Sequence, residues 1–273
     1  MKGIIIAAGY GSRLRPLTAT TPKSLVKIDG KSIITYPIDA LMTAGISDIS
    51  IVVGYRADEI INSIEKLYPN INFSYNEDYD GGNAISIFAA RSFIGNDPFV
   101  LTMGDHLISS SLVTTLLSES TITRTLCVDS EAKNASQISD GTRVMADSKG
   151  RIIEIGKDLK NWKSIDTGLF MMDGEVLDNI KYLMNRQGNK VTISEVVQHM
   201  ADNGRHFQIC DVSGQFWADV DTEEDHDSVS ALLKEGYAYD ILRLKDRSNR
   251  SSDTIENHRF QIRPMKGSAH ERY

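Results

Sequence analysis

The chain has 273 residues, of which 41% are hydrophobic and 25% charged, and its formal net charge at pH 7 is −7. This composition is typical of a globular protein with a real core, and the length suits one α/β unit with an appendage. A net negative surface repels nucleic acid unless basic residues gather on one face, so the charge argues against a general nucleic-acid binder.

In the first half of the chain, strands and helices are predicted to alternate. Residues 3–8, GIIIAA, form a short apolar run that is typical of a strand buried on both faces. Residues 32–45 carry apolar side chains at helical spacing and end at Gly45, a residue type that often ends helices. The same patterns predict strands at 48–55, 71–76 and 98–105 and helices at 57–68 and 84–94.

This alternation predicts an α/β fold of Rossmann-like type, with a mainly parallel sheet and helices on both faces. In such a sheet the ligand lies in the crevice at the carboxyl ends of the strands. The glycine-rich segment after the first strand, Gly81-Gly82-Asn83 and Asp105 all follow predicted strands, so we expect them to meet at one edge.

The second half of the chain is less regular. Its patterns predict strands and turns at 125–130, 141–157 and 164–173, a helix at 194–204 and a pair of strands within 206–222. From about Asp240 the composition turns polar, and we expect 246–273 to be a C-terminal extension. This extension can pair two copies of the chain as a homodimer, contact a membrane-bound synthase or have no role.

The two cysteines, Cys127 and Cys210, form no CxxC pair, so a zinc site or a disulfide framework is not expected. No apolar stretch reaches the ~18 residues needed to span a bilayer. The N-terminus runs directly into a predicted strand, with no cleavable signal. These features predict a cytoplasmic protein without a membrane span.

The first strand is followed by AAGYGSRLRPLTATTPK, residues 7–23. Gly9 and Gly11 lack a Cβ, so the backbone can turn tightly there and present its N–H groups to an anion. Arg13 and Lys23 add positive charge, and the two prolines stiffen the loop. The segment therefore predicts a cradle for a polyphosphate.

Two other phosphate-binding motifs do not fit this segment. A dinucleotide fingerprint has a third glycine, but Leu14 stands at that position. The chain also continues into RLRPLTATTPK instead of a regular helix, and the Walker motif GxxxxGK[ST] is absent. A dinucleotide-dependent oxidoreductase is therefore disfavoured.

Residues 7–34, AAGYGSRLRPLTATTPKSLVKIDGKSII, resemble the signature of the nucleoside-triphosphate-transferase family, which comprises sugar-1-phosphate and phospho-alcohol nucleotidyltransferases. The pattern AAGxGxRLxPLTxxxPKxLxxxxGxPxI is matched almost throughout, with Ser32 where the family often has proline. The resemblance implies the nucleotide-diphospho-sugar transferase fold. It also implies that Lys23 contacts the α-phosphate and that the nucleotide is bound by Ala7, Ala8, Gly9, Gly11, Ser12, Arg13, Lys23, Gly82, Asn83 and Asp105.

Carboxylates that could hold Mg²⁺, a cation that prefers oxygen ligands, are Asp105 in FVLTMGDH and Asp219 and Asp221 in FWADVDTEED. The resemblance makes Asp105 the first metal ligand and Asp221 the second, with Asp219 as the alternative. Asp219 and Asp221 are two residues apart, so on one strand they would share a face. The remaining acids of 222–225 are expected to begin a helix, where negative charge is favoured.

The resemblance also implies where the second substrate, the acceptor, binds. Lys157 stands where relatives place a lysine on the acceptor's phosphate, and the segment SIDTGLF resembles the family's acceptor pocket. His106 stands beside Asp105, where many sugar-nucleotide members have asparagine, and Glu195 is a weaker candidate. The predicted acceptor residues are His106, Lys157, Asp166, Thr167, Gly168 and Glu195.

Together GGNAIS, LTMGDH, DTGLF and WADVDTEED resemble the inositol-1-phosphate cytidylyltransferase branch of the family. The resemblance implies one transferase domain over 1–245, with a nucleotide-binding part at about 1–120 and a smaller mixed acceptor part at about 121–245. The implied reaction transfers CMP from CTP to inositol 1-phosphate with Mg²⁺ as cofactor, and Arg13, Lys23 and Lys157 are the implied catalytic residues. Alternatives are a sugar-1-phosphate nucleotidyltransferase using UTP, dTTP, GTP or ATP, a phosphocholine cytidylyltransferase, or a non-catalytic nucleotide sensor.

Overall fold

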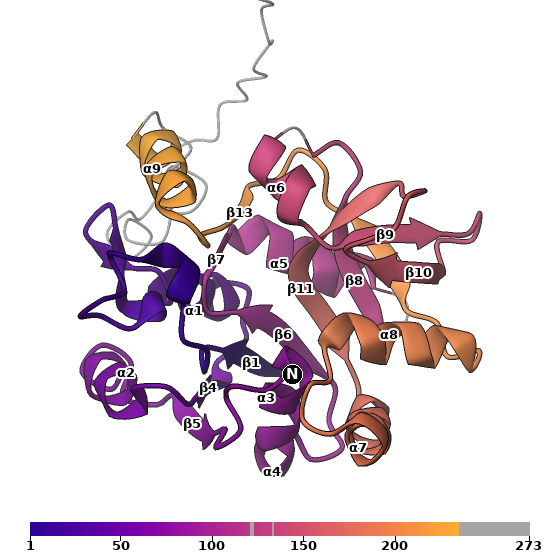
Figure 1. Ribbon diagram of the computed structural model, residues 1–273, viewed down its shortest axis with the longest axis horizontal. Helices are drawn as coiled ribbons and strands as arrows, with labels where there is room; N and C mark the ends of the chain where they lie inside the picture. Colours follow the sequence, from indigo (N-terminus) through magenta and orange to yellow (C-terminus); the bar gives the residue numbers. More distant parts are fainter. Residues whose placement is uncertain (121–122, 133, 235–273) are drawn as a thin grey trace, which may run out of the picture. The chain divides into compact units, whose positions relative to one another are not determined.

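The computed structural model describes residues 1–120, 123–132 and 134–234 (Figure 1). The described residues build one large mixed sheet, and four of its strands form a parallel block in the order β6-β1-β4-β5. The bounds of these strands are β1 (Lys2–Ile6), β4 (Asp48–Val53), β5 (Asn72–Tyr75) and β6 (Phe99–Met103). Their carboxyl ends therefore lie at the same edge, as the sequence predicts.

The second half of the chain extends this sheet with mostly antiparallel strands. The long strand β11 (Ser164–Met172) pairs with β6, and it also contacts β8 (Thr125–Asp129) and β9 (Arg143–Ala146). The outer strands are β10 (Ile152–Gly156), beside β9, and β12 (Gln208–Asp211), beside β8. One sheet thus runs through both predicted parts of the domain, and the assignment of nucleotide to one part and acceptor to the other stays a prediction.

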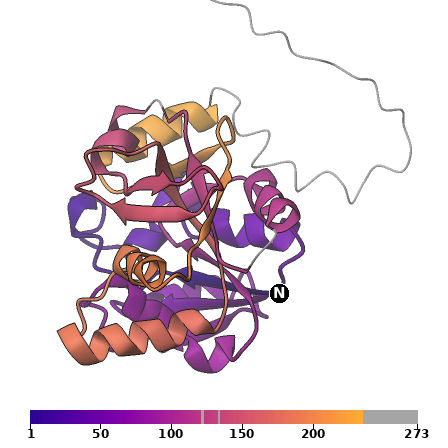
Figure 2. The same cartoon turned by 90° about the vertical axis from the view of Figure 1, so that its right-hand side faces the viewer.

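Helices cover both faces of the sheet (Figures 1 and 2). Successive strand residues point to opposite faces, so Ile5 joins one buried apolar cluster and Ile4 the other. The Ile5 face is covered by α1 (Thr35–Thr43), α2 (Ala57–Ile64) and α5 (Ser110–Glu119). The Ile4 face is covered by α3 (Asn83–Ala89), α4 (Arg91–Ile94), α7 (Glu175–Gln187) and α8 (Ile193–Asp202).

A third apolar cluster joins the start of the chain to the end of its described part. Leu14, in the 3-10 turn η1 (Ser12–Leu14), packs with Val220 and with Val229 of α9 (Glu223–Leu232). The same cluster contains residues of two small strand pairs and Val26, which directly follows the turn η2 (Lys23–Leu25). These pairs are β2 (Lys27–Ile28) with β3 (Lys31–Ser32) and β7 (His106–Ile108) with β13 (Trp217–Asp219).

Most predicted elements are confirmed, with ends shifted by a few residues, and the acids of 222–225 do begin a helix. The two strands predicted within 206–222 are present as β12 and β13, but the expectation that they pair with each other was wrong, because β12 pairs with β8 and β13 pairs with β7. Among the elements that were not predicted are β7, α5, α6 (Ala135–Asp140) and α7.

The extension at 246–273 lies outside the described residues. Within the part of the chain that the structure describes, no helix has the length and apolar character needed to cross a membrane.

Candidate active site

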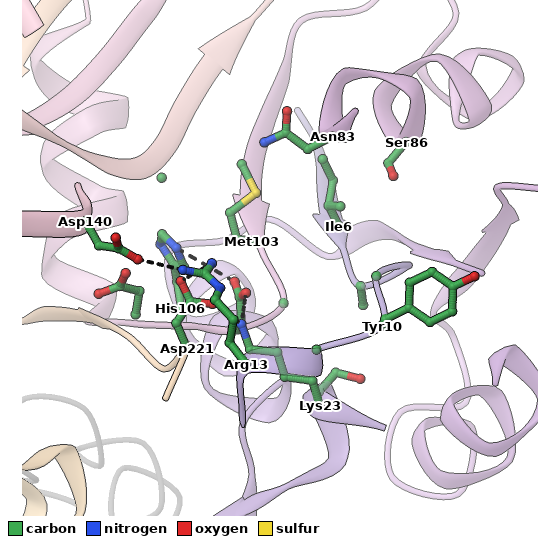
Figure 3. A pocket seen from close by; sticks show the side chains of 18 of the residues that line it. Ile6, Tyr10, Arg13, Lys23, Asn83, Ser86, Met103, His106, Asp140 and Asp221 are labelled. Carbon is green, nitrogen blue, oxygen red and sulfur yellow. Dashed lines mark hydrogen bonds and ion pairs between the residues drawn. The ribbon is translucent and has the colours of Figure 1, made fainter. Parts of the chain in front are cut away.

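A cavity of about 540 Å³ lies at the carboxyl ends of β1 and β6 (Figure 3). It brings together residues that the sequence singles out from six separate segments. The predicted residues that line it are Ala7, Gly9, Gly11, Ser12, Arg13, Lys23, Gly82, Asn83, Asp105, His106, Lys157, Asp166, Gly168 and Asp221. Ala8, Thr167 and Glu195 do not line it.

Lys23 lies between the two carboxylates that are predicted to hold the metal. Its Nζ donates to Oδ2 of Asp105 at 2.5 Å and to Oδ1 of Asp221 at 2.5 Å. Asp105 follows β6, whereas Asp221 lies between β13 and α9. The Lys23 side chain is only 11% exposed, so the three charges form a mostly buried group.

The pKa values of this group follow from burial and pairing. Burial alone would lower the pKa of Lys23, but Asp105 and Asp221 outweigh burial and raise it. Burial would raise the pKa of Asp105, yet Lys23, with a smaller effect from His106, lowers it to about 2. Lys23 and Asp105 are therefore both charged at neutral pH.

The donor set fits Mg²⁺. Two carboxylates already converge on one cationic nitrogen, and a divalent ion at that place would meet the same two oxygen ligands. Among the described residues, no group of three or more His, Cys, Asp or Glu side chains forms a complete metal cage. Mg²⁺ is commonly held by one or two carboxylates, with phosphate oxygens and water completing its shell, so the pair suits a metal that arrives with a phosphate substrate.

The local fold explains why Asp221 reaches this point. Thr222 and Asp225 form a capping box at the start of α9, and Oδ2 of Asp225 also accepts a hydrogen bond from the Asp221 N–H at 3.2 Å. Strand β13 ends at Asp219, so the expectation that Asp219 and Asp221 share one strand face was wrong. Both side chains still line the cavity.

Arg13 bridges two segments across the cavity (Figure 3). Its Nη1 donates to Asp140 at 2.6 Å and its Nη2 to Asp221 at 2.7 Å. The Arg13 side chain is 55% exposed, so solvent weakens both pairs and a phosphate can replace the carboxylates. Asp140, at the end of α6, was not predicted, because nothing in its local sequence marks it.

The two glycines of the opening motif have different roles. A Cβ on Gly9 would meet no atom within 4 Å, so Gly9 leaves open space in the cavity where a ligand can approach the backbone. Gly11 has φ +62°, and a Cβ there would lie 2.4 Å from Cβ of Lys23. Gly11 therefore allows Lys23 to pack against the loop.

Gly81 and Gly82 both line the cavity, and packing on their other side requires each of them to be glycine. A Cβ on Gly82 would lie 2.0 Å from the carbonyl oxygen of Val191, and one on Gly81 would lie 2.3 Å from that of Asn189. Oδ1 of Asn83 accepts a hydrogen bond from the Ile193 N–H at 2.8 Å. This segment thus joins the cavity wall to the start of α8.

His106 and Gly168 are packed against each other in a part of the cavity wall away from the glycine loop. Nδ1 of His106 lies 3.0 Å from the carbonyl oxygen of Thr167, and because a carbonyl only accepts, Nδ1 carries the hydrogen. Gly168 has φ +76°, and a Cβ there would lie 2.4 Å from the His106 ring. Thr167 is fully buried and donates to the Cys127 carbonyl, so it supports this wall from behind.

Two further carboxylates and one lysine face this part of the cavity. Burial raises the pKa of Asp166 to about 6, although the Gly168 N–H donates to its Oδ1 at 2.7 Å. Burial also raises the pKa of Asp219. Lys157, directly after β10, supplies positive charge to the same wall. This part of the cavity is therefore equipped for a ligand with both a phosphate and hydrogen-bond donors.

Two of the predicted site residues that do not line the cavity, Glu195 and Ala8, have structural contacts elsewhere. Oε2 of Glu195 accepts hydrogen bonds from Thr192 N and Oγ1 at 2.7 and 2.8 Å, which forms a capping box at the start of α8. Ala8 is 1% exposed, and its carbonyl accepts from the Tyr55 N–H at 2.9 Å. The cavity is also lined by residues that were not predicted, among them Tyr10, Tyr79, Gln137, Asp140 and Trp217.

Known proteins resemble this chain in sequence and in fold. The chain is 29% identical over 225 residues to a bifunctional IPC transferase and DIPP synthase of Archaeoglobus fulgidus, over 82% of this chain and 42% of that protein. It is 24% identical over 266 residues to a glucose-1-phosphate thymidylyltransferase of Streptomyces antibioticus, over 96% of this chain and 71% of that protein. The chain spans about half the length of the bifunctional relatives it matches.

A solved structure, the inositol-1-phosphate CTP transferase from T. maritima, matches with a TM-score of 0.75 and 25% identity, over 86% of this chain and 96% of that one. The sequence model of the nucleotidyl transferase family matches residues 2–235. Because this match covers most of the chain, it confirms the resemblance seen in the opening motif, and the protein belongs to the nucleotidyl transferase family.

Proposed function

We propose that this chain transfers CMP from CTP to a phosphorylated alcohol, inositol 1-phosphate, and releases pyrophosphate. The observation that carries the proposal is the convergence of Asp105 and Asp221 on Lys23, beside a glycine-rich loop, in one cavity. The similarity to an inositol-1-phosphate CTP transferase supports the choice of CTP and of the acceptor.

The nucleotide's phosphates would bind the open backbone at Gly9 and the half-exposed Arg13. Lys23 would contact the α-phosphate, whose negative charge replaces that of a carboxylate as its partner. When bound by Asp105 and Asp221, Mg²⁺ supplies positive charge against the phosphate oxygens. Arg13 then stabilises the pyrophosphate as it leaves.

The acceptor would bind between Lys157 and the His106–Gly168 wall. Lys157 attracts its phosphate, and the carboxylates of Asp166 and Asp219 accept hydrogen bonds from its hydroxyl groups. An oxygen of the acceptor's phosphate attacks the α-phosphorus as the bond to pyrophosphate breaks. Both reactants are held in one cavity, which gives the enzyme its main advantage, orientation.

A sugar-1-phosphate nucleotidyltransferase that uses another nucleoside triphosphate is the second candidate, and the similarity to a glucose-1-phosphate thymidylyltransferase favours it. A non-catalytic sensor is disfavoured, because binding alone requires neither the lysine nor the pair of carboxylates. The cytoplasmic location and the homodimer stay predictions.

Pyrophosphate release tests the proposal directly. Purified protein with Mg²⁺ is assayed with CTP, UTP, dTTP, GTP and ATP, each against a panel of inositol 1-phosphate, phosphocholine and sugar 1-phosphates. We expect the highest turnover with CTP and inositol 1-phosphate. A nucleotide that binds without any pyrophosphate release would support the sensor instead.

Matched variants test the assigned roles. Lys23→Ala and Asp105→Ala should lose most turnover while remaining folded, whereas Lys27→Ala, at an exposed lysine of β2, should not. Asp221→Asn should raise the Mg²⁺ concentration needed for activity more than Asp219→Asn does. Near-normal kcat in Lys23→Ala or Asp105→Ala would refute the assignment.

A further inference from the structure

A cluster of three tyrosines, Tyr10, Tyr55 and Tyr79, stands at the cavity and has no part in the chemistry above. The ring centroid of Tyr10 lies 4.8 Å from that of Tyr55 and 5.3 Å from that of Tyr79. The Tyr55 and Tyr79 rings are 6.3 Å apart, so all three pairs lie in the range of favourable aromatic contact. Tyr10 and Tyr79 line the cavity.

The backbone holds this tyrosine cluster in place. Tyr55 donates its N–H to the Ala8 carbonyl at 2.9 Å, which fixes it beside the opening loop. A Cβ on Gly54 would lie 2.6 Å from Cβ of Tyr79, so the glycine lets Tyr79 pack closely. Tyr10, between Gly9 and Gly11, remains 48% exposed. The Tyr10 ring is thus packed against the rings of Tyr55 and Tyr79, while about half of its surface remains exposed to solvent.

The tyrosine cluster and the acceptor residues lie at opposite ends of the cavity. In Figure 3, Arg13 and Lys23 lie between Tyr10 on one side and Asp140 on the other. Asp166 and Lys157, which are assigned to the acceptor, lie next to the segment that follows Asp140, because the Asp166 N–H donates to the Thr142 carbonyl at 2.9 Å and Gly156 pairs with Arg143. Asp80 acts electrostatically on Tyr10, and the neutral Gly81 and Gly82, which follow Asp80 in the chain, also line the cavity.

We propose that Tyr10 stacks on the base of the bound nucleoside triphosphate, with Tyr55 and Tyr79 holding its ring in position. The proposal rests on the proposed function, which places the triphosphate on the opening loop, Arg13 and Lys23. If Arg13 and Lys23 bind the phosphates in the middle of the cavity and the acceptor occupies the Asp140 side, the base lies on the Tyr10 side. Stacking accepts the flat face of any base, so Tyr10 contributes affinity and not base selectivity.

Calorimetric titration with two probes tests this role. The probes are CTP and inorganic tripolyphosphate, which has the phosphates without the base, both with Mg²⁺. Tyr10→Ala should bind CTP about tenfold more weakly than wild type, within the range measured for loss of one stacked base. Its affinity for tripolyphosphate should match that of wild type. Tyr10→Phe, which keeps the ring, should bind CTP about tenfold more tightly than Tyr10→Ala.

Tyr75→Ala is the matched control, because this tyrosine of β5 is 56% exposed and lies outside the cavity. Equal CTP affinity in wild type and Tyr10→Ala would overturn the proposal while leaving the proposed function intact. Equal weakening of CTP and tripolyphosphate would also overturn it, because the substitution would then have altered the phosphate loop. A wild-type protein that binds no nucleoside triphosphate would refute the proposed function, and this proposal with it.

Discussion

The ammonium nitrogen of Lys23 lies 2.5 Å from Oδ1 of Asp221, although the two residues are 198 positions apart in the chain. The capping box of α9 holds Asp221. The apolar cluster of Leu14 and Val220 packs the first and last described segments together. The charged group of Lys23, Asp105 and Asp221 therefore exists only when these distant segments have folded together, and its charges depend on one another.

Lys23→Met should make the stability of the protein depend on Mg²⁺. Without the ammonium group, Asp105 and Asp221 repel each other, and removing one partner of a buried ion pair costs up to about 3–5 kcal/mol. Mg²⁺ can take the place of the lost charge between the carboxylates. We expect MgCl₂ to raise the unfolding temperature, measured against EDTA, more in Lys23→Met than in wild type.

The double variant with Asp221→Asn separates this effect from general salt stabilisation. It removes the repulsion along with the lysine, so the enlarged response to MgCl₂ should disappear. An equal response in wild type and Lys23→Met would show that the two carboxylates do not form the metal site.

The parallel half of the fold was predictable because its signal is local. Buried strands such as β1, which overlaps the apolar run at 3–8, show continuous apolar sequence, and the helices between them show one apolar face. Helix α7 was missed although its sequence carries the signal, since Val176 and Ile180 lie at helical spacing and are buried. The partners of β12 and β13 carry no such local signal, because neighbours in sequence usually pair and these two do not.

The candidate site also has residues whose place could be predicted from the sequence and residues whose place could not. Gly9, Arg13 and Lys23 lie within one motif, so their shared place at the cavity was predictable. Asp140 reaches Arg13 only because α6 folds over the cavity, and a lone aspartate gives no sign of that. Gly82 was predicted at the site and lines the cavity, but nothing in the sequence indicated that the Val191 carbonyl leaves no room for a side chain there. A sequence shows that a position must be small, and only the contacts show why.

Asp166→Asn should stabilise the protein while it weakens acceptor binding. The pKa of Asp166 is raised to about 6 by burial, from a usual value near 4. Between about pH 4 and pH 6 the folded state keeps a proton that the unfolded state has lost, so the stability of wild type falls as pH rises through this window. The wild-type free energy of unfolding falls by on the order of 3 kcal/mol across this window. The asparagine variant does not lose this stability, because its side chain does not ionise.

Urea unfolding at pH 4, 5, 6 and 7 checks this prediction. The stability difference between Asp166→Asn and wild type should grow across the series, whereas Asp158→Asn, at an exposed aspartate, should show no such trend. A constant difference would mean that the carboxyl group of Asp166 ionises as freely in the fold as in water.

Two glycine substitutions should affect different properties: Gly82→Ala should lower the stability of the fold, and Gly9→Ala should lower the affinity for CTP. Gly82→Ala places a Cβ 2.0 Å from the Val191 carbonyl, so we expect a loss of about 1–3 kcal/mol of stability. Gly9→Ala meets no atom within 4 Å, so its unfolding temperature should match that of wild type. Its methyl group enters the cavity, and CTP affinity should fall. If Gly9→Ala binds CTP normally, the loop backbone does not approach the nucleotide.

Glu195→Ala should affect stability and not the acceptor. Its carboxylate already accepts hydrogen bonds from Thr192, so losing this capping box should cost about 1 kcal/mol in the free energy of unfolding. The KM for the acceptor should stay at the wild-type value, because the side chain does not line the cavity. Lys157→Ala, which changes a residue of the cavity wall, should raise that KM without a comparable loss of stability. The reverse pattern, a raised KM with unchanged stability in Glu195→Ala, would mean that this carboxylate leaves the helix start to bind the acceptor when substrate is present.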